Sequence, residues 1–238
     1  MTSPPNVRVL ARLHDEIVAC RACPRLVDWR EEVARVKRRA YRDESYWGRP
    51  VPGFGDPNAR IVIVGLAPGA HGANRTGRVF TGDRSGDFLF AALHRAGLAS
   101  QPTSTHRDDG LALRDVFVLP AVRCVPPDNH PSREEQAECA PFVDRELALL
   151  PRARVLFALG AIAFDATLAW YARISFGKTS PMRARFAHGA EVTLDGDRTL
   201  LCSYHVSQQN TQTGRLTPAM FDEVLRRARV LAERGSVS

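Results

Sequence analysis

The chain has 238 residues and a net charge of +7, because its 33 Lys and Arg residues outnumber its 26 Asp and Glu residues. Apolar residues make up 44% and charged residues 25% of the chain, and these fractions exclude wholesale disorder. No stretch approaches the roughly 20 apolar residues of a membrane-spanning helix, and residues 1–6 lack the basic and apolar segments of a signal peptide. We therefore expect a cytoplasmic protein that does not span a membrane. The positive net charge slightly favours an anionic partner such as a nucleic acid.

A pair of cysteines follows the first predicted helix. The apolar positions within residues 7–17 have the spacing of an amphipathic helix, and Cys20 and Cys23 come directly after it. Two thiolates at this spacing can bind one metal centre, although redox motifs share the same spacing. A thioredoxin-like pair normally follows a strand, so the position of this pair argues against redox chemistry.

The loop after the first predicted strand, residues 61–65, is rich in glycine. Six of the 17 glycines lie within residues 65–86, and this density lets a backbone approach a ligand closely. The loop is no phosphate-binding P-loop, because Arg78 and Val79 stand where Lys and Ser or Thr are needed. It also contains Phe80 and Asp83, which have two interpretations: a ligand site, or a core aromatic and the cap of the next helix.

Two further cysteines lie near the second predicted strand, residues 116–122. Cys124 ends that apolar run, and Cys139 lies within a helical pattern at residues 134–149. Together with the early pair they make four thiolates, which suit zinc or a [4Fe–4S] cluster. The alternative is that both are small buried hydrophobic residues. Cys202 lies in a buried apolar run and is expected to pack in the core.

The last predicted strand, residues 200–204, leads into a polar loop at residues 204–215. The loop consists mostly of amide and hydroxyl side chains with His205 near its start, and these groups suit contacts to phosphates and bases. A solvated surface loop is the alternative. Since ligands bind at the carboxyl ends of parallel strands, we expect this loop and the glycine-rich loop to form one site.

The order of the elements predicts the fold class. Four continuous apolar runs, with the third at residues 155–159, alternate with helical patterns, and Thr217 and Pro218 begin the last helix. We therefore expect an α/β protein with a three-layer α/β/α arrangement around a central, mostly parallel four-stranded sheet. The chain shows no long linker, so we expect a single domain over residues 1–238.

These segments together resemble the uracil-DNA glycosylase superfamily, and within it the family 5 (type b) enzymes. The resemblance covers about residues 16–232. It rests on the motif GLAPGAHGANRTGRVFTGD at residues 65–83, the motif HVSQQNTQTGRL at residues 205–216, the order and spacing of the four cysteines, and the Pro-Pro-Asp-Asn segment that ends at Asn129.

The resemblance implies an activity and a cofactor. Such an enzyme flips a damaged base out of single- or double-stranded DNA and hydrolyses the bond to its sugar, leaving an abasic site. Uracil is the expected base, with hypoxanthine and ethenocytosine as further substrates, and the protein is expected to be a monomer. A [4Fe–4S] cluster with a structural role, remote from the chemistry, would be held by Cys20, Cys23, Cys124 and Cys139. The alternative is a non-catalytic iron–sulfur module that binds DNA.

The resemblance also implies roles for residues at the site. Phe80 would stack on uracil, and Asn129 would bind its polar edge. Backbone amides near Ala67 and Gly69 would bind the 2-carbonyl together with His205, and Asp83 would orient water. Sister families carry a polar residue where this chain has Ala67, so Asp83 receives the water-handling role by resemblance alone. The DNA contacts outside the pocket would come from Asn74, Arg75, Arg78, Ser207, Gln208, Gln209, Asn210 and Arg215.

Overall fold

The computed structural model describes residues 5–174, 184–194 and 198–234. The ends of the predicted domain, residues 1–4 and 235–238, lie outside this description. The α-helices are α1 (Pro5–Ala19), α2 (Pro24–Val36), α3 (Ala73–Thr76), α4 (Arg84–Arg95), α5 (Arg133–Ala148), α6 (Ala161–Ile174), α7 (Gln208–Gln212) and α8 (Pro218–Glu233), and the short 3₁₀ helices are η1 (Arg39–Tyr41) and η2 (Pro127–Asn129).

A sheet of six strands lies at the centre of the described structure, in the order β1-β3-β2-β4-β6-β5. Its inner strands β3 (Val116–Pro120), β2 (Ile61–Gly65), β4 (Val155–Leu159) and β6 (Thr199–Ser203) are parallel and correspond to the four predicted strands. Short antiparallel strands, β1 (Phe54–Gly55) and β5 (Glu191–Thr193), pair with the two edges. The α/β class is confirmed, and the sheet is wider than expected because neither edge strand has an apolar run to reveal it.

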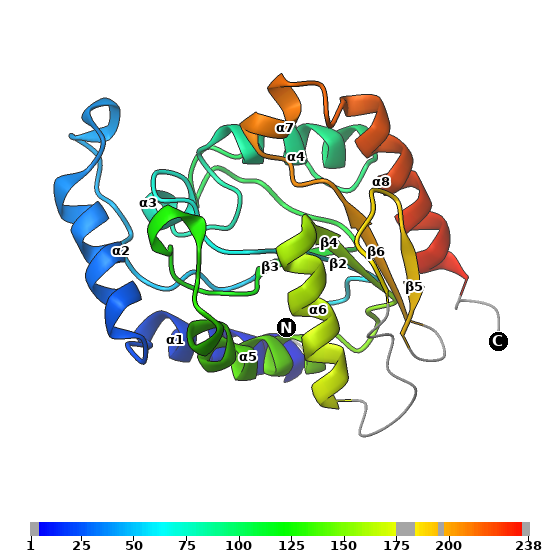
Figure 1. Ribbon diagram of the computed structural model, residues 1–238, viewed down its shortest axis with the longest axis horizontal. Helices are drawn as coiled ribbons and strands as arrows, with labels where there is room; N and C mark the ends of the chain where they lie inside the picture. The colour runs from blue at the N-terminus through cyan, green and yellow to red at the C-terminus, as the bar shows by residue number, and fades with distance from the viewer. Residues whose placement is uncertain (1–4, 175–183, 195–197, 235–238) are drawn as a thin grey trace.

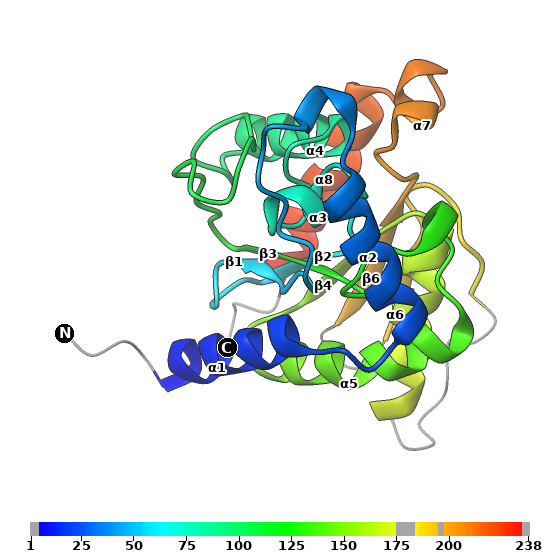
Figure 2. The ribbon, with the colours of Figure 1, turned by 90° about the vertical axis from the view of Figure 1, so that its left-hand side faces the viewer.

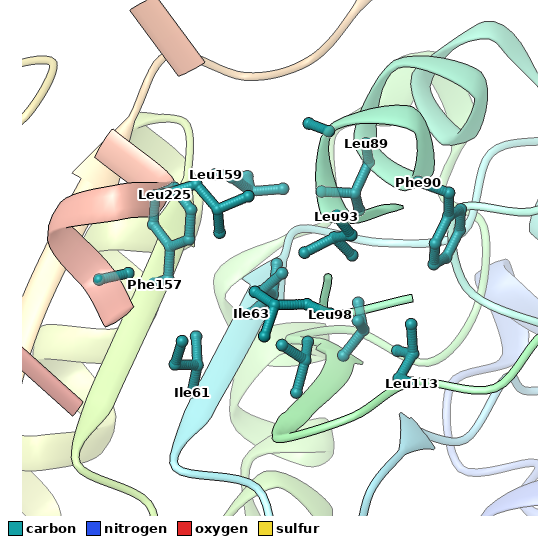
Figure 3. Close-up of a cluster of buried hydrophobic side chains, with 14 of the residues drawn as sticks. Ile61, Ile63, Leu89, Phe90, Leu93, Leu98, Leu113, Phe157, Leu159 and Leu225 are labelled. Carbon is teal, nitrogen blue, oxygen red and sulfur yellow. The ribbon is translucent and has the colours of Figure 1, made fainter. Parts of the chain in front are cut away.

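Helices cover both faces of this sheet (Figure 1). On one face, Ile61, Ile63 and Phe157 pack against leucines of α4 and α8, as Figure 3 shows. On the other face, alternate strand residues such as Val62 and Leu156 pack against α1, α5 and α6. The inner strands are apolar throughout because both of their faces are buried, which produces the predicted three layers.

Local sequence signals set the ends of the helices that frame the site. Ser132 and Glu135 form a capping box at the start of α5, with Glu135 N donating to Ser132 Oγ at 3.2 Å and Ser132 N donating to Glu135 Oε2 at 2.7 Å. Asp83 caps α4, and Thr217 caps α8 before Pro218. Among the described residues, no helix is long and apolar enough to span a membrane.

Candidate active site

One open cavity of about 580 Å³ lies at the carboxyl edge of the parallel strands. Its walls come from the loops that follow β2, β3, β4 and β6, so the two loops singled out in the sequence do converge there. The predicted site residues that line it are Ala67, Gly69, Phe80, Asp83, Asn129, His205, Ser207 and Gln209.

Phe80 and His205 face each other in this cavity. Their ring centroids lie 6.2 Å apart, with the ring planes inclined by 37°. The Phe80 ring packs directly on Gly65, where an added Cβ would lie 2.9 Å from the ring, and Phe80 itself has a left-handed φ of 49°. Gly160 makes similar room for His205, since a Cβ there would lie 3.1 Å from His205 Cβ. Both rings are therefore seated against glycine backbone.

His205 has the electrostatics of a neutral hydrogen-bond donor. Burial lowers the pKa of its imidazole below the ordinary value of 6.5, so the ring is uncharged at neutral pH. Its ring nitrogens have no hydrogen-bond partner in the part of the chain that the structure describes, whereas its backbone oxygen accepts a bond of 2.8 Å from Asn210 Nδ2. The residue is thus fixed through its backbone, and its ring can still bind a ligand.

Asp83 serves as a helix cap and as part of the cavity wall. Its Oδ1 accepts a hydrogen bond of 3.0 Å from Gly86 N at the start of α4. Its Oδ2 lies against Gly72, where an added Cβ would be 1.9 Å away, so only glycine fits. Burial raises the pKa of Asp83 above 3.8, and the amides of Gly86 and Ser85 partly oppose that rise. Both interpretations of Asp83 from the sequence are therefore compatible with its position.

Asn129 stands at the exposed rim of the cavity on a strained backbone. Asp128 and Asn129 have left-handed φ values of 53° and 58°, although neither is glycine. Such conformations cost of the order of 1–3 kcal/mol each and occur often at functional sites. The side-chain amide of Asn129 has no hydrogen-bond partner among the described residues, so both its donor and its acceptor can meet a ligand.

The backbone of the glycine-rich loop also offers donors. The carbonyls of Gly65 and Leu66 accept from Ala121 N and Val122 N at 2.9 and 2.8 Å, which extends the pairing of β2 and β3. The amides of Ala67 and Gly69 donate to no other described backbone group. These two amides line the cavity and resemble the donors that stabilise a developing anion.

The structure corrects the predicted DNA contacts of the first motif. The side chains of Asn74, Arg75 and Arg78 are buried. Asn74 Nδ2 donates to a backbone oxygen of α2, Arg75 pairs with Glu44, and Arg78 pairs with Asp109 at 2.7 Å. Because these groups are enclosed and bonded within the protein, they hold the loop in shape and do not face DNA.

The second motif keeps most of its predicted residues at the surface. Gln208 and Gln209 are exposed on α7, Ser207 is half-buried just before it, and exposed Arg215 stacks on Tyr204 at 4.7 Å. Asn210 instead turns inward to hold the backbone of His205. DNA contact by the residues of this motif stays a prediction.

Several lining residues were missed in the sequence. The first turn of α6 contributes Ala161, Ile162 and Ala163 to the cavity, and Ile162 is 42% exposed there. Asp128 and His130 flank Asn129 and also line the cavity. The turn of α6 follows the predicted strand at residues 155–159, so the rule about carboxyl strand ends would have found it.

The four predicted cysteine ligands line a second, smaller cavity. Cys124 and Cys139 are buried, Cys20 and Cys23 are half-buried, and burial raises the pKa of Cys139 to about 11. Arg30 Nη1 donates to Cys124 Sγ at 2.9 Å. Within the described ranges, no three His, Cys, Asp or Glu side chains are arranged to hold a single metal ion.

The cysteine cavity and the candidate active site have a neighbour in common, and a cluster remote from the chemistry stays a prediction. Ala67 packs against the buried cluster of Leu26, Val122, Cys124 and Cys139, and the same residue lines the larger cavity. Cys202 lies elsewhere, fully buried with its thiol donating to Ala187 O at 3.0 Å, which confirms its core position.

Comparisons with known proteins agree with this geometry. A family model described as the uracil DNA glycosylase superfamily matches residues 52–229. The Type-5 uracil-DNA glycosylase of Thermus thermophilus is 58% identical over 216 residues, which cover 91% of this chain and 95% of that protein. Proteins of the same name from Mycobacterium leprae and Pyrobaculum aerophilum are 52% and 46% identical, over 94% and 92% of this chain and 96% of each of those proteins.

Proposed function

The chain belongs to the uracil-DNA glycosylase superfamily, and from this premise we propose that it removes uracil from DNA in base-excision repair. As a monofunctional glycosylase it hydrolyses the N-glycosidic bond and leaves an abasic site. The observation that carries this function is the single cavity shared by the rings of Phe80 and His205. A base inside a duplex cannot reach that cavity, so the target nucleotide must be flipped out.

The residues of the cavity suit recognition of a pyrimidine ring. The Phe80 ring offers an apolar face on which a flipped base stacks. The Asn129 amide both donates and accepts, which matches the N3–H and C4 carbonyl of uracil. Because the Asn129 side chain has no partner among the described residues, binding uracil breaks no existing hydrogen bond of that amide.

The chemistry follows from where charge develops. Glycosidic hydrolysis passes through an oxocarbenium-like transition state, so negative charge grows on the departing uracil. Neutral His205 and the amides of Ala67 and Gly69 donate to that anion, and one such donor is typically worth about 2.7–4 kcal/mol. The ionised carboxylate of Asp83, which accepts a hydrogen bond from Gly86 N at the start of α4, orients the attacking water.

The substrate range is broader than uracil in this proposal. Ala67 has no polar side chain that could form a hydrogen bond with the base. A site with few hydrogen-bonding side chains discriminates less between bases. Hypoxanthine and ethenocytosine are therefore further substrates, in single- and double-stranded DNA. Outside the cavity, Ser207, Gln208, Gln209 and Arg215 supply contacts to DNA. A cytoplasmic location and a monomeric state are part of the same proposal.

The cysteine cavity suits a [4Fe–4S] cluster with a structural role. Four thiols line it, and the buried guanidinium of Arg30 donates to one of them while its Nε has no hydrogen-bond partner in the described chain. An anionic cluster would offset that buried positive charge, and hydrogen bonds to sulfur are a normal part of such sites. The thiols must lose protons when they bind iron, so the pKa values raised by burial make assembly release protons. The cluster takes no part in bond cleavage.

Base excision tests the enzymatic function directly. Labelled oligonucleotides with one uracil are incubated with the wild type, His205→Ala and Cys202→Ala, and abasic sites are then cleaved with alkali. The wild type and Cys202→Ala should cleave, whereas His205→Ala should lose about 10²–10³-fold in rate. Binding of the oligonucleotide without any abasic product would support the non-catalytic DNA-binding module instead.

Metal analysis tests the cluster separately. Purified wild type should be brown and contain iron and acid-labile sulfide, and Cys139→Ser should lose both. Cys202→Ser is the matched control and should keep them, because Cys202 lies in the core away from the cavity. Zinc in place of iron, or iron that survives Cys139→Ser, would contradict the proposed ligand set.

A further inference from the structure

An arginine of α2 contacts the segment that carries Asn129, more than a hundred positions further along the chain. Arg25 Nη2 donates to the backbone oxygen of His130 at 3.1 Å. Its Nε and Nη2 also donate to the two carboxylate oxygens of Glu135, at 2.8 and 2.7 Å. Figures 1 and 2 show the segment after β3 lying beside α2.

Glu135 connects this contact to the start of α5. Its Oε2 accepts from Ser132 N at 2.7 Å as well as from Arg25, and its side chain is only 9% exposed. Arg25 hydrogen-bonds to this carboxyl and holds its pKa below the usual range. The guanidinium of Arg25 thus donates to three oxygen atoms: the backbone oxygen of His130 and both carboxylate oxygens of Glu135, which caps α5.

The segment needs such support because its backbone is strained. Asp128 and Asn129 both have left-handed φ values and both are exposed. A strained conformation persists only where its surroundings fix it on either side. Before the strained pair, Cys124 and Val125 are buried in the protein. After it, His130 N donates to Pro127 O at 3.0 Å and the His130 ring contacts Asp128 O, both within the turn itself. Among the described residues, Arg25 adds the side-chain hydrogen bond that His130 O receives from another element.

We propose that Arg25 is a positioning residue for uracil excision, which fixes the backbone after Asn129 and so keeps the Asn129 amide at the rim of the cavity. This inference rests on the proposed function, because it assigns Arg25 a role through Asn129. Arginine is required by the geometry: its planar fork reaches both carboxylate oxygens and the carbonyl at once, whereas lysine offers a single point charge. An ordinary exposed ion pair would have no such role.

The test compares single-turnover excision by the wild type, Arg25→Met, Asn129→Ala and the double variant. Arg25→Met should lose roughly tenfold in rate, because misplacement of a substrate-binding group reduces the rate of the chemical step. In the Asn129→Ala background the same change should have no further effect. Arg25→Lys should fall between the wild type and Arg25→Met.

Arg95→Met is the matched control. Arg95 also makes a two-bond pair with a carboxylate far along the chain, Asp222, at 3.0 and 2.8 Å, and it is 46% exposed against 48% for Arg25. Its excision rate should equal that of the wild type. The proposal would be overturned if Arg25→Met lowered the excision rate by the same factor in the wild-type and Asn129→Ala backgrounds. It would also be overturned if the rate of Arg25→Met equalled that of Arg95→Met. Loss of bound iron in Arg25→Met would also overturn it, by moving the effect to the cysteine cavity.

Hydrogen exchange tests the same inference without activity. The amides of Asp128, Asn129, His130 and Ser132 should exchange faster in Arg25→Met than in the wild type, and Arg95→Met should leave them unchanged. Unchanged exchange in Arg25→Met would contradict the positioning role. An inactive wild type with the expected exchange pattern would count against the proposed function and not against the contact, so the two failures are distinguishable.

Discussion

The glycine-rich loop of residues 65–83 has one face on the cavity and one face inside the protein, and the two faces use their polar groups differently. On the cavity face, the amides of Ala67 and Gly69 donate to no other described backbone group, and burial raises the pKa of Asp83. On the inner face, Arg75 and Arg78 are buried and each is paired with a carboxylate. The same short segment thus contains two backbone amides without a described backbone acceptor beside two arginines that are paired with carboxylates.

The difference separates function from stability. Donors that lie on an open cavity and have no described backbone acceptor are available to bind a ligand. Paired and buried groups need no ligand, and their removal leaves an uncompensated charge. Changes on the inner face should therefore act on folding, and changes on the cavity face on excision.

Arg78→Met should have the largest effect, and the effect should be on folding. The pair with Asp109 is buried on both sides, at 4% and 5% exposure. Removal of one partner of such a pair destabilises by about 3–5 kcal/mol. Urea denaturation should show this loss, while Arg95→Met, in an exposed pair, should lose less than about 1 kcal/mol. Normal stability with weakened DNA binding would restore Arg78 as a DNA contact.

Asp83→Asn should separate the role of Asp83 in excision from its role as the cap of α4. Asparagine still caps α4 but cannot carry the charge that orients water, so excision should fall roughly 10²-fold. The pKa of Asp83 is raised in the folded state, so its ionised form reduces stability at neutral pH, and Asp83→Asn should unfold no more easily than the wild type. Asp83→Ala, which removes the cap, should lose about 1 kcal/mol in the same urea titration. Full excision by Asp83→Asn would assign the water to another group.

The sequence predicted the parts of this molecule that depend on local pattern. The inner strands follow from continuous apolar runs, and the start of α8 from Thr217 and Pro218. The edge strand β5 has an exposed, half-buried, exposed pattern, and β1 has only two residues, so neither leaves a signal. Arg78 was misassigned because its charge is visible in the sequence, whereas its partner Asp109 is 31 positions away and is brought close only by folding.

The same limit applies to the candidate site. Glycine density and the polar loop predicted a shared cavity, since carboxyl strand ends meet at one edge. The contact of Ala67 with the cysteine cluster, in contrast, depends on packing between side chains from four segments, and spacing alone cannot give it. The left-handed backbone at Asp128 and Asn129 has a weak signal in the sequence, because Asp and Asn tolerate this conformation better than other non-glycine residues, but the signal does not show that Arg25 lies beside it.

The pH dependence of excision should report only the cavity face. His205 must be neutral and its pKa lies below 6.5, while Asp83 must be ionised and its pKa lies above 3.8. Both groups must therefore lose protons, so the single-turnover rate should rise with pH to a plateau and fall on the acid side of it, up to tenfold per pH unit for each group. Asp83→Asn should keep only the contribution of His205. A rate that rises on acidification would mean that the protonated imidazole is the active form.

The smallest expected effect comes from Arg215, the exposed basic residue of the second motif. A single phosphate contact changes the slope of log K against log salt by about 0.9, so Arg215→Ala should make the slope for duplex binding shallower by that amount. Arg226→Ala is the control, because Arg226 is also exposed but pairs with Glu223 on α8. Its slope should equal that of the wild type. If Arg215→Ala also leaves the slope unchanged, Arg215 does not contact a phosphate and instead stabilises the loop by stacking on Tyr204. The arginines of both motifs would then stabilise the walls of the cavity rather than bind DNA.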